Sequence, residues 1–286
     1  MGPYGYYVFL FLYLIAIWGV QVGTLISIVD FLDNLPWFAK IFPSPTSMKL
    51  FLHVTCTFLC MILVFLKDMK PLVPVSSLSI AALLISFLLL LGYGIVVNGL
   101  SFSPSMLKPL SAVDLLSSIG VASFSLGYNF SYLSFFKQVK PSLRVKAKKA
   151  TGSCIAVITF FLIVLPLVAF LSYSSAPGGI KSNILLSIPE EKPIAIAVSM
   201  MMFLSCLFTY PIYSPPLNEI LEETVPNKKT VGIFVSDARR LCYRILQTVG
   251  ISLVAWFCPF FGDIISLVGG FVFTAISCVI PPVLSL

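Results

Sequence analysis

Long uninterrupted runs of apolar residues dominate the chain. Ile80–Val97 and Ile155–Leu171 are almost continuously apolar, and each is close to the roughly 20 residues that a helix needs to cross a bilayer. These runs do not alternate apolar and polar residues, as the strands of a membrane β-barrel do. The pattern therefore predicts an all-α, polytopic transmembrane bundle, because a helix satisfies each backbone amide within its own segment.

We count eight predicted spans, which together form a single transmembrane domain over residues 1–286. Serine, glycine and asparagine interrupt the apolar run of the fourth span, which distinguishes it from the others. The predicted spans are 5–29, 48–66, 76–98, 113–136, 151–174, 193–213, 239–257 and 263–285.

The composition agrees with a lipid solvent. Hydrophobic residues make up 58% of the chain and charged residues 10%, with a mean hydropathy of +1.03. A soluble domain carries roughly 25% charged residues, so this chain has too few to cover a water-facing surface. We therefore expect an integral, multi-pass membrane protein whose surroundings are a lipid bilayer.

The basic residues predict the orientation of the spans. Most of the 18 Lys and Arg residues lie in or beside the loops after the second, fourth and sixth spans. Basic loops tend to stay in the cytoplasm, which places these loops and both termini on that side. The plasma membrane and a vacuolar, lysosomal or other endomembrane all fit this pattern. We interpret the net charge of +7 as this topology signal, and no nucleic-acid module accompanies it.

Uncharged polar residues mark a candidate solute site, because ionisable residues are nearly absent from the spans. In the fourth span they favour a locally unwound helix whose freed backbone groups bind solute or ion. The alternative is a face of small residues packed on another helix. For the polar residues of the first and sixth spans two interpretations are open: they either face a cavity or make interhelical hydrogen bonds. The candidate substrate-binding residues are Ser123, Phe124, Ser125, Gly127, Tyr128, Asn129, Gln21, Ser205 and Thr209.

Two further features each leave two interpretations open. The single histidine, His53, is either a proton-responsive switch or an ordinary polar contact near a helix start. Three prolines after Thr209 remove backbone donors, and mark either a helix end at the interface or a hinge beside the solute path. The spans show no paired carboxylates, His-rich cluster or Ser/His pair, so we predict neither an enzyme nor a bound metal or organic cofactor.

The run from Pro259 to Phe271, with Pro281-Pro282 behind it, is similar to the tenth helix of the amino acid/auxin permease family. The resemblance to that family covers most of the chain. Tyr210-Pro211 resembles the end of its eighth helix, and Arg244 matches the basic residue that opens its ninth. The fourth span and the turn at 137–141 resemble its sixth helix, although this turn lacks the usual acidic residue.

This resemblance implies the LeuT-like fold of the APC superfamily, which consists of two inverted five-helix repeats. Solute is then held between the broken first and sixth helices, and amino acids are transported with H⁺ or Na⁺. The eight spans correspond to helices three to ten of the family. Helices one, two and eleven have no counterpart, so the inverted-repeat fold is expected to be incomplete.

Two functions follow from this resemblance. The first is secondary active transport of amino acids, coupled to H⁺ or Na⁺. The alternative is a truncated, non-transporting paralogue or fragment that acts at most as a membrane interaction partner. An oligomer or a partner chain would then supply the missing helices.

Overall fold

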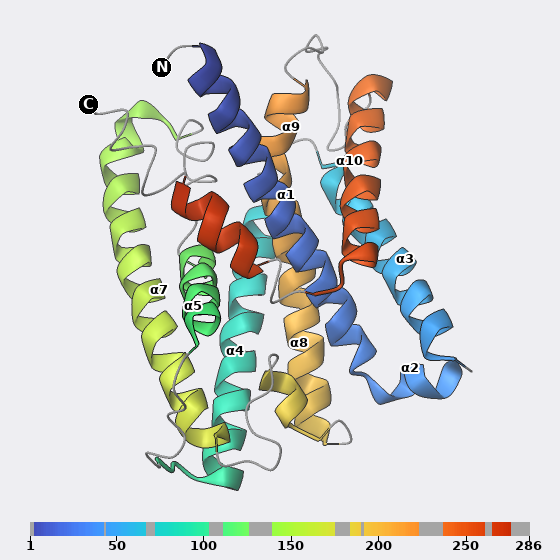
Figure 1. Ribbon diagram of the computed structural model, residues 1–286, viewed down its shortest axis with the longest axis vertical. Coiled ribbons are helices and arrows are strands. Elements are labelled where there is room, and N and C mark those ends of the chain that lie inside the picture. The colour runs from blue at the N-terminus through green and yellow to red at the C-terminus, as the bar shows by residue number, and fades with distance from the viewer. Residues whose placement is uncertain are drawn as a thin grey trace. The chain divides into compact units, whose positions relative to one another are not determined.

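The computed structural model describes residues 3–42, 44–66, 72–102, 111–125, 139–174, 184–189, 192–222, 237–260 and 265–275. Helices make up nearly all of these ranges, and no β-strand occurs within them. The predicted all-α class is therefore confirmed. Figure 1 labels the main helices along the chain.

The α-helices follow the apolar runs of the sequence, and short 3₁₀ turns lie between some of them. The turns η2 (Pro141–Leu143), η3 (Ile184–Ser187) and η4 (Tyr210–Ile212) precede or follow the longer helices, and residues Val268–Phe273 form a π-helix, η5. The α-helices are α1 (Pro3–Asp33), α2 (Pro36–Ile41), α3 (Pro45–Val64), α4 (Leu72–Asn98), α5 (Ala112–Ser125), α7 (Arg144–Tyr173), α8 (Pro193–Thr209), α9 (Ser214–Glu222) and α10 (Ala238–Phe257).

Five helical segments of the described ranges are long and apolar enough to cross a membrane. They are Tyr7–Asp33, Pro45–Val64, Val73–Asn98, Pro141–Tyr173 and Pro193–Asn218. The last of these includes α8 and the first part of α9, so it runs beyond the range of 193–213 predicted from the sequence. The chain is accordingly an integral membrane protein.

Capping residues explain where two of the helices begin. Ser44 precedes α3, and its Oγ accepts a hydrogen bond from the Ser47 amide at 3.2 Å. Asp237 precedes α10, and its carboxylate accepts a hydrogen bond from the Arg239 amide at 3.0 Å. Each cap satisfies an amide that has no partner within the helix, which is worth about 1 kcal/mol.

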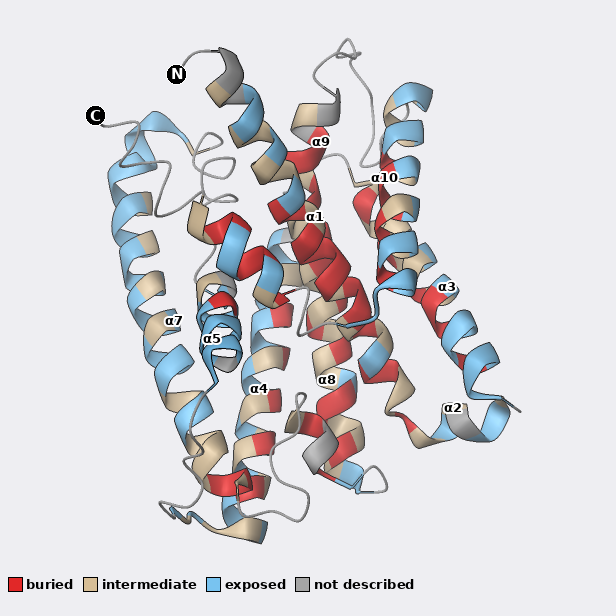
Figure 2. Ribbon diagram, viewed as in Figure 1, coloured by how far each residue is buried: buried red, intermediate tan, exposed pale blue. Residues whose placement is uncertain are grey.

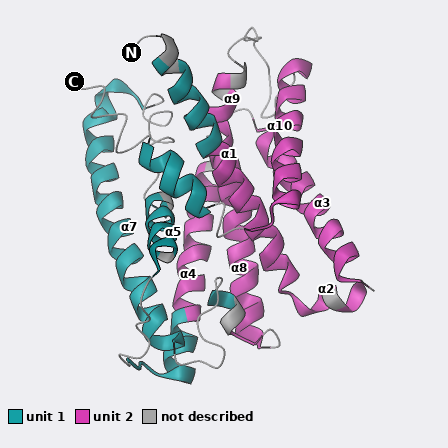
Figure 3. Ribbon diagram, viewed as in Figure 1, with its two compact units in different colours: residues 1–16, 91–187, 262–286 teal, residues 17–90, 188–261 magenta. Residues whose placement is uncertain are grey.

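The chain divides into two compact units, which Figure 3 colours separately. Unit 1 comprises Met1–Ala16, Leu91–Ser187 and Gly262–Leu286, and unit 2 comprises Ile17–Leu90 and Ile188–Phe261. The candidate site residues are divided between them. Residues 123–129 belong to unit 1, whereas Gln21, Ser205 and Thr209 belong to unit 2.

Burial differs strongly among the helices. The unit 2 part of α1 is largely buried and appears red in Figure 2, with Leu25 and Ile28 fully enclosed. In contrast, none of the residues in the apolar middle of α7 is buried. Its exposed residues include Val157, Phe160 and Ile163, and such an apolar surface suits contact with lipid chains.

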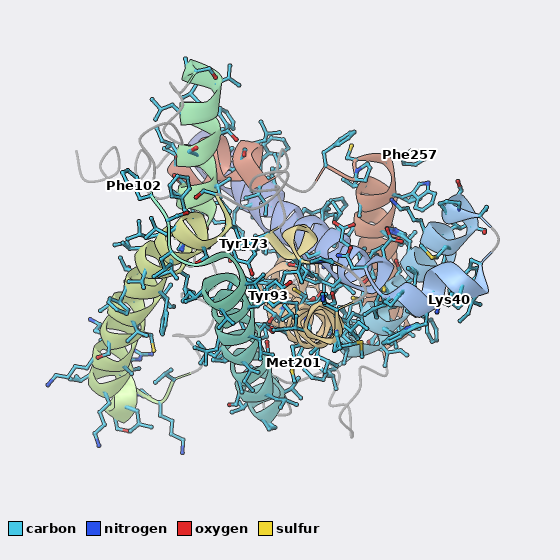
Figure 4. All side chains as sticks on the ribbon, turned by 90° about the horizontal axis from the view of Figure 1, so that it is seen from below. Lys40, Tyr93, Phe102, Tyr173, Met201 and Phe257 are labelled. Atoms are coloured by element: carbon cyan, nitrogen blue, oxygen red, sulfur yellow. The ribbon has the colours of Figure 1, made fainter. Side chains whose placement is uncertain are left out.

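Within unit 1, a glycine allows α4 and α7 to approach closely. A Cβ added at Gly94 would lie 2.5 Å from the ring of Tyr173, a side chain that is fully buried. Figure 4 shows Tyr173 beside the end of α4 that carries Tyr93. The amide of Ser101, just after α4, also donates a hydrogen bond to the Leu171 carbonyl of α7. Close approach at a glycine is a common mode of helix packing in membranes.

We expect Gly94→Ala to lower the thermal stability of the detergent-solubilised protein. The added methyl group overlaps the Tyr173 ring, and such overpacking costs about 1–3 kcal/mol. The matched control is Gly92→Ala, because a Cβ at Gly92 meets nothing within 4 Å. Alanine also has the higher helix propensity, so this control should be neutral or stabilising. Equal melting temperatures for the two variants would contradict the proposed α4–α7 contact.

Candidate solute-binding site

A broken helix crosses the interior of unit 2. The α-helix α8 ends at Thr209, the 3₁₀ turn η4 follows, and α9 begins at Ser214 (Figure 1). Pro211 lacks an amide hydrogen, so the Leu207 carbonyl loses the donor that an α-helix would supply. Tyr210, Pro211 and Ser214 are all buried. The chain therefore continues as a helix through the protein interior beyond the prolines, and the break is enclosed rather than placed at a surface.

Gln21 of α1 connects this broken helix to α10. Its Nε2 donates a hydrogen bond to Ser214 Oγ of α9 at 2.9 Å, and its Oε1 accepts one from Gln247 Nε2 of α10 at 3.3 Å. All three side chains are buried, with Gln21 at 0% exposure. Gln247 of α10 therefore donates to Gln21 of α1, and Gln21 in turn donates to Ser214 of α9.

Ser205 and Thr209 of α8 form a second polar group with Ser79 of α4. Ser79 Oγ lies 3.1 Å from Ser205 Oγ and 2.9 Å from Thr209 Oγ1, and it donates to the Ser205 carbonyl at 3.0 Å. Thr209 Oγ1 donates to the same carbonyl at 2.7 Å. Four oxygen atoms thus converge just before the break in the helix, and each has a partner within the protein.

Several buried polar atoms near the break find no hydrogen-bond partner in the described part of the chain. They are Tyr210 Oη in η4, Asn218 Oδ1 in α9, and Gln247 Oε1 in α10. A polar group that is buried without a partner costs about 1–3 kcal/mol. Buried polar atoms without a partner therefore lie on both sides of the break, and one of them belongs to the Gln21 group.

The candidate residues of the fourth span lie in unit 1. Ser123 Oγ is 3.5 Å from Thr274 Oγ1, just after η5, and the exposed Ser125 donates to the Val121 carbonyl of its own helix at 2.9 Å. α5 is a regular α-helix up to Ser125, and the rest of the segment predicted to unwind lies outside the described residues. Candidate positions outside the described residues are the Phe124 side chain, Gly127, Tyr128 and Asn129.

Small residues also bring α5 and η5 together. A Cβ at Gly120 would collide with the Ser266 carbonyl, and a Cβ at Gly270 would lie 3.4 Å from the Gly120 Cα. Ser117 Oγ lies 2.8 Å from Ser266 Oγ. The described part of the fourth span therefore forms a small-residue packing face, which was one of the two interpretations of its sequence.

His53 lies in a third polar cluster of unit 2, between α3 and α10. Its Nε2 is 2.9 Å from both the carbonyl and the hydroxyl oxygen of Ser252, and Thr57 Oγ1 is 2.8 Å from the same hydroxyl. A carbonyl only accepts hydrogen bonds, so Nε2 carries the hydrogen in this contact. The ring also packs edge-on against Trp256. This geometry favours the ordinary polar contact over the proton switch.

Arg244 anchors α10 to the end of α3. Only 5% of the residue is exposed, and its Nη1 donates to the carbonyls of Val64 at 2.8 Å and Leu66 at 2.9 Å. These carbonyls lie at the C-terminal end of α3, where the helix dipole favours a positive charge. The residue that opens the seventh predicted span is therefore a cap for a neighbouring helix.

The sequence analysis did not single out several residues of these clusters. Ser79, Ser214 and Gln247 supply the partners of the predicted residues, and Asn218 lies four residues after Ser214. Residues four apart share one face of a helix, so the spacing of Ser214 and Asn218 was a usable signal. Ser79 and Gln247 are isolated polar residues, and only packing reveals their partners.

These features define a class, namely a polytopic helical membrane protein with uncharged polar groups enclosed at a broken helix. Residues 1–286 match the family model described as transmembrane amino acid transporter protein. The chain therefore belongs to the transmembrane amino acid transporter family, and the resemblance found in the sequence is confirmed. No solved structure matches the chain.

Several curated proteins of Arabidopsis thaliana are similar to parts of the chain. GABA transporter 1 is 30% identical over 159 residues, which are 51% of this chain and 34% of that protein. Amino acid transporter ANT1 is 31% identical over 46% of this chain and 32% of its own length. Amino acid transporter AVT1B is 26% identical over 77% of this chain and 38% of its own length. The chain thus spans about a third of the length of these relatives.

We expect a double-mutant cycle to detect the bond between Gln21 and Ser214. Gln21→Leu and Ser214→Ala each leave a buried partner unsatisfied, so each should destabilise the protein by about 1–3 kcal/mol. The double variant should lose less stability than the two single variants together. The difference, which is the coupling free energy, should be about 0.5–1.5 kcal/mol. In the control cycle, Gln21→Leu is combined with Ser27→Ala, whose hydroxyl bonds the Gly23 carbonyl of its own helix. Additive effects in both cycles would refute the bond.

We expect Arg244→Leu to destabilise the protein by about 2–4 kcal/mol in a thermal or denaturant unfolding assay, because two buried carbonyls lose a charged donor. Arg244→Lys should recover part of this loss, since it keeps a cation at the C-terminus of α3. The control is Arg239→Leu, which changes an exposed residue of the same helix. The capping role is wrong if the leucine and lysine variants are equally unstable, or if Arg239→Leu matches them.

Proposed function

We propose that this chain carries out secondary active transport of amino acids across a membrane. The observation that carries this proposal is the family match over residues 1–286. Among the relatives, GABA transporter 1 is named for the transport of GABA and amino acid transporter AVT1B for the transport of amino acids. We further propose coupling to H⁺ or Na⁺, which would provide the driving force for accumulation.

The polar chemistry of unit 2 supports a small zwitterionic substrate. The described clusters around Gln21 and Ser79 consist of amides and hydroxyls, which can bind charged ends of a solute without a permanent charge of their own. The prolines of the break also leave the carbonyls of Leu207, Pro211 and Ile212 without their usual helical donors. In membrane transporters, such interrupted helices hold substrates and ions.

In this proposal the polar residues of the fourth span are the central substrate contacts, and Gln21, Ser205 and Thr209 are secondary ones. Gln21, Ser205 and Thr209 are hydrogen-bonded within the protein, so they would exchange these partners for solute during transport. The proposed central residues are Ser123, Phe124, Ser125, Gly127, Tyr128 and Asn129.

The orientation and the membrane are also proposals. Four basic residues, at positions 144, 146, 148 and 149, are exposed in the first turns of α7, which agrees with a cytoplasmic position for this end of the helix. Both termini would then be cytoplasmic. The host membrane would be the plasma membrane or a vacuolar, lysosomal or other endomembrane.

Uptake into proteoliposomes tests this function. The polypeptide expressed from the complete reading frame that contains these 286 residues is reconstituted and supplied with radiolabelled amino acids. Uptake should be saturable and should increase when an inward H⁺ or Na⁺ gradient is imposed. Asn129→Leu should reduce it at least about tenfold, because a substrate contact worth about 1.4 kcal/mol would be lost.

The control is Arg239→Leu, which lies far along the chain from every proposed substrate contact and should transport normally. Absence of uptake by the folded wild-type protein, with and without each gradient, would favour the non-transporting alternative. Normal uptake by Asn129→Leu would retain the function but remove the fourth span as its central site.

A further inference from the structure

Two buried polar side chains flank the prolines that interrupt the broken helix: Tyr210 precedes them and Asn218 follows them. The Tyr210 side chain is fully buried in η4, and Asn218 is 7% exposed in α9. Tyr210 Oη and Asn218 Oδ1 find no hydrogen-bond partner in the described part of the chain. Both groups would be better solvated in water, so each raises the free energy of this arrangement.

Asn218 Oδ1 differs from the hydroxyl of Ser214, a residue of the same helix face that has a hydrogen-bond partner. Ser214 lies four residues earlier on α9 and accepts a hydrogen bond from Gln21 at 2.9 Å. In α10, Gln247 also has an unpaired buried atom, Oε1. Like Asn218 Oδ1, it is an acceptor, so neither oxygen could satisfy the other.

The backbone of the same segment is also weakly held. Pro211, Pro215 and Pro216 have no amide hydrogen, so three helical hydrogen bonds are missing between α8 and α9. Tyr213 lies between Pro211 and Pro215, and its backbone amide donates a hydrogen bond to the Tyr210 carbonyl with a long N–O distance of 3.3 Å. Missing backbone bonds and unpaired side chains therefore coincide within nine residues. Unpaired buried groups are uncommon in native structures, so their presence in this segment calls for an explanation.

We propose that Tyr210 and Asn218 are positioning residues of the transport cycle, which destabilise the described arrangement of the break so that it exchanges with a second one. In the second arrangement the phenol and the amide gain partners or water. The proposal rests on the transport function proposed above. A gradient or a substrate moves such an equilibrium only when the two states differ little in free energy, and the unpaired groups keep that difference small.

The sign of the stability change tests the proposal. Tyr210→Phe and Asn218→Leu each remove an unpaired group with little change in shape, so both should raise the melting temperature by about 2–4 °C. They should also lower the maximal uptake rate about threefold or more, with a smaller change in KM, because the described arrangement becomes too stable. Amide hydrogen exchange in residues 205–218 should slow in both variants.

Ser214→Ala is the matched control, because it removes a buried polar group that has a partner. This variant should lower the melting temperature and should not slow hydrogen exchange in the segment. If Tyr210→Phe and Asn218→Leu also lower the melting temperature, the two groups are ordinary stabilising contacts and the proposal is overturned. A higher melting temperature with an unchanged uptake rate overturns it equally.

The outcome for wild-type protein separates this proposal from the transport function. If wild-type protein transports and both variants transport at the same rate, the positioning role fails and the transport function stands. If wild-type protein does not transport, the transport function fails. Slower hydrogen exchange in the two variants would then still support a mobile break, and unchanged exchange would reject it.

Discussion

The need to pair every polar group inside an apolar environment governs this structure. Water is absent from the bilayer core, so an unpaired amide or hydroxyl has no alternative partner there. Helices satisfy the backbone, and many hydroxyls are satisfied by the carbonyl one turn earlier in the same helix. This second solution recurs through the chain, in Thr24, Ser27, Thr57, Ser86, Ser172 and Thr248.

Polar groups that do not bond within their own helix determine which helices of unit 2 meet. Lipid chains are as apolar as leucine, so apolar contact alone specifies little about helix partners in a membrane. Gln21 requires α9 and α10, Ser79 requires α8, and His53 requires Ser252 of α10. Each of these contacts is lost if a helix rotates or slides by one turn. The polar clusters thus supply register as well as stability.

The sequence predicted the parts of this structure that depend on local chemistry. Run length and composition predicted spanning helices, and the prolines after Thr209 predicted a disturbed helix. The sequence did not predict that a helix resumes at Ser214 within the interior, because that depends on what surrounds the break. Likewise, Gln21, Ser205 and Thr209 stood out as isolated polar residues, but their partners Gln247 and Ser79 are distant along the chain. Residues 127–129 of the proposed site remain predictions.

The different kinds of polar contact in unit 2 suit different mechanical roles. Arg244 is a buried charge, and separating it from the Val64 and Leu66 carbonyls would break two charge-assisted hydrogen bonds at a high cost in free energy. It therefore suits a fixed junction between α3 and α10. The hydroxyls and amides near the break are neutral, and each can exchange one neutral partner for another at a small cost. A carrier must alternate between states of similar free energy, so movement is expected where the contacts are neutral and not where the guanidinium is bound.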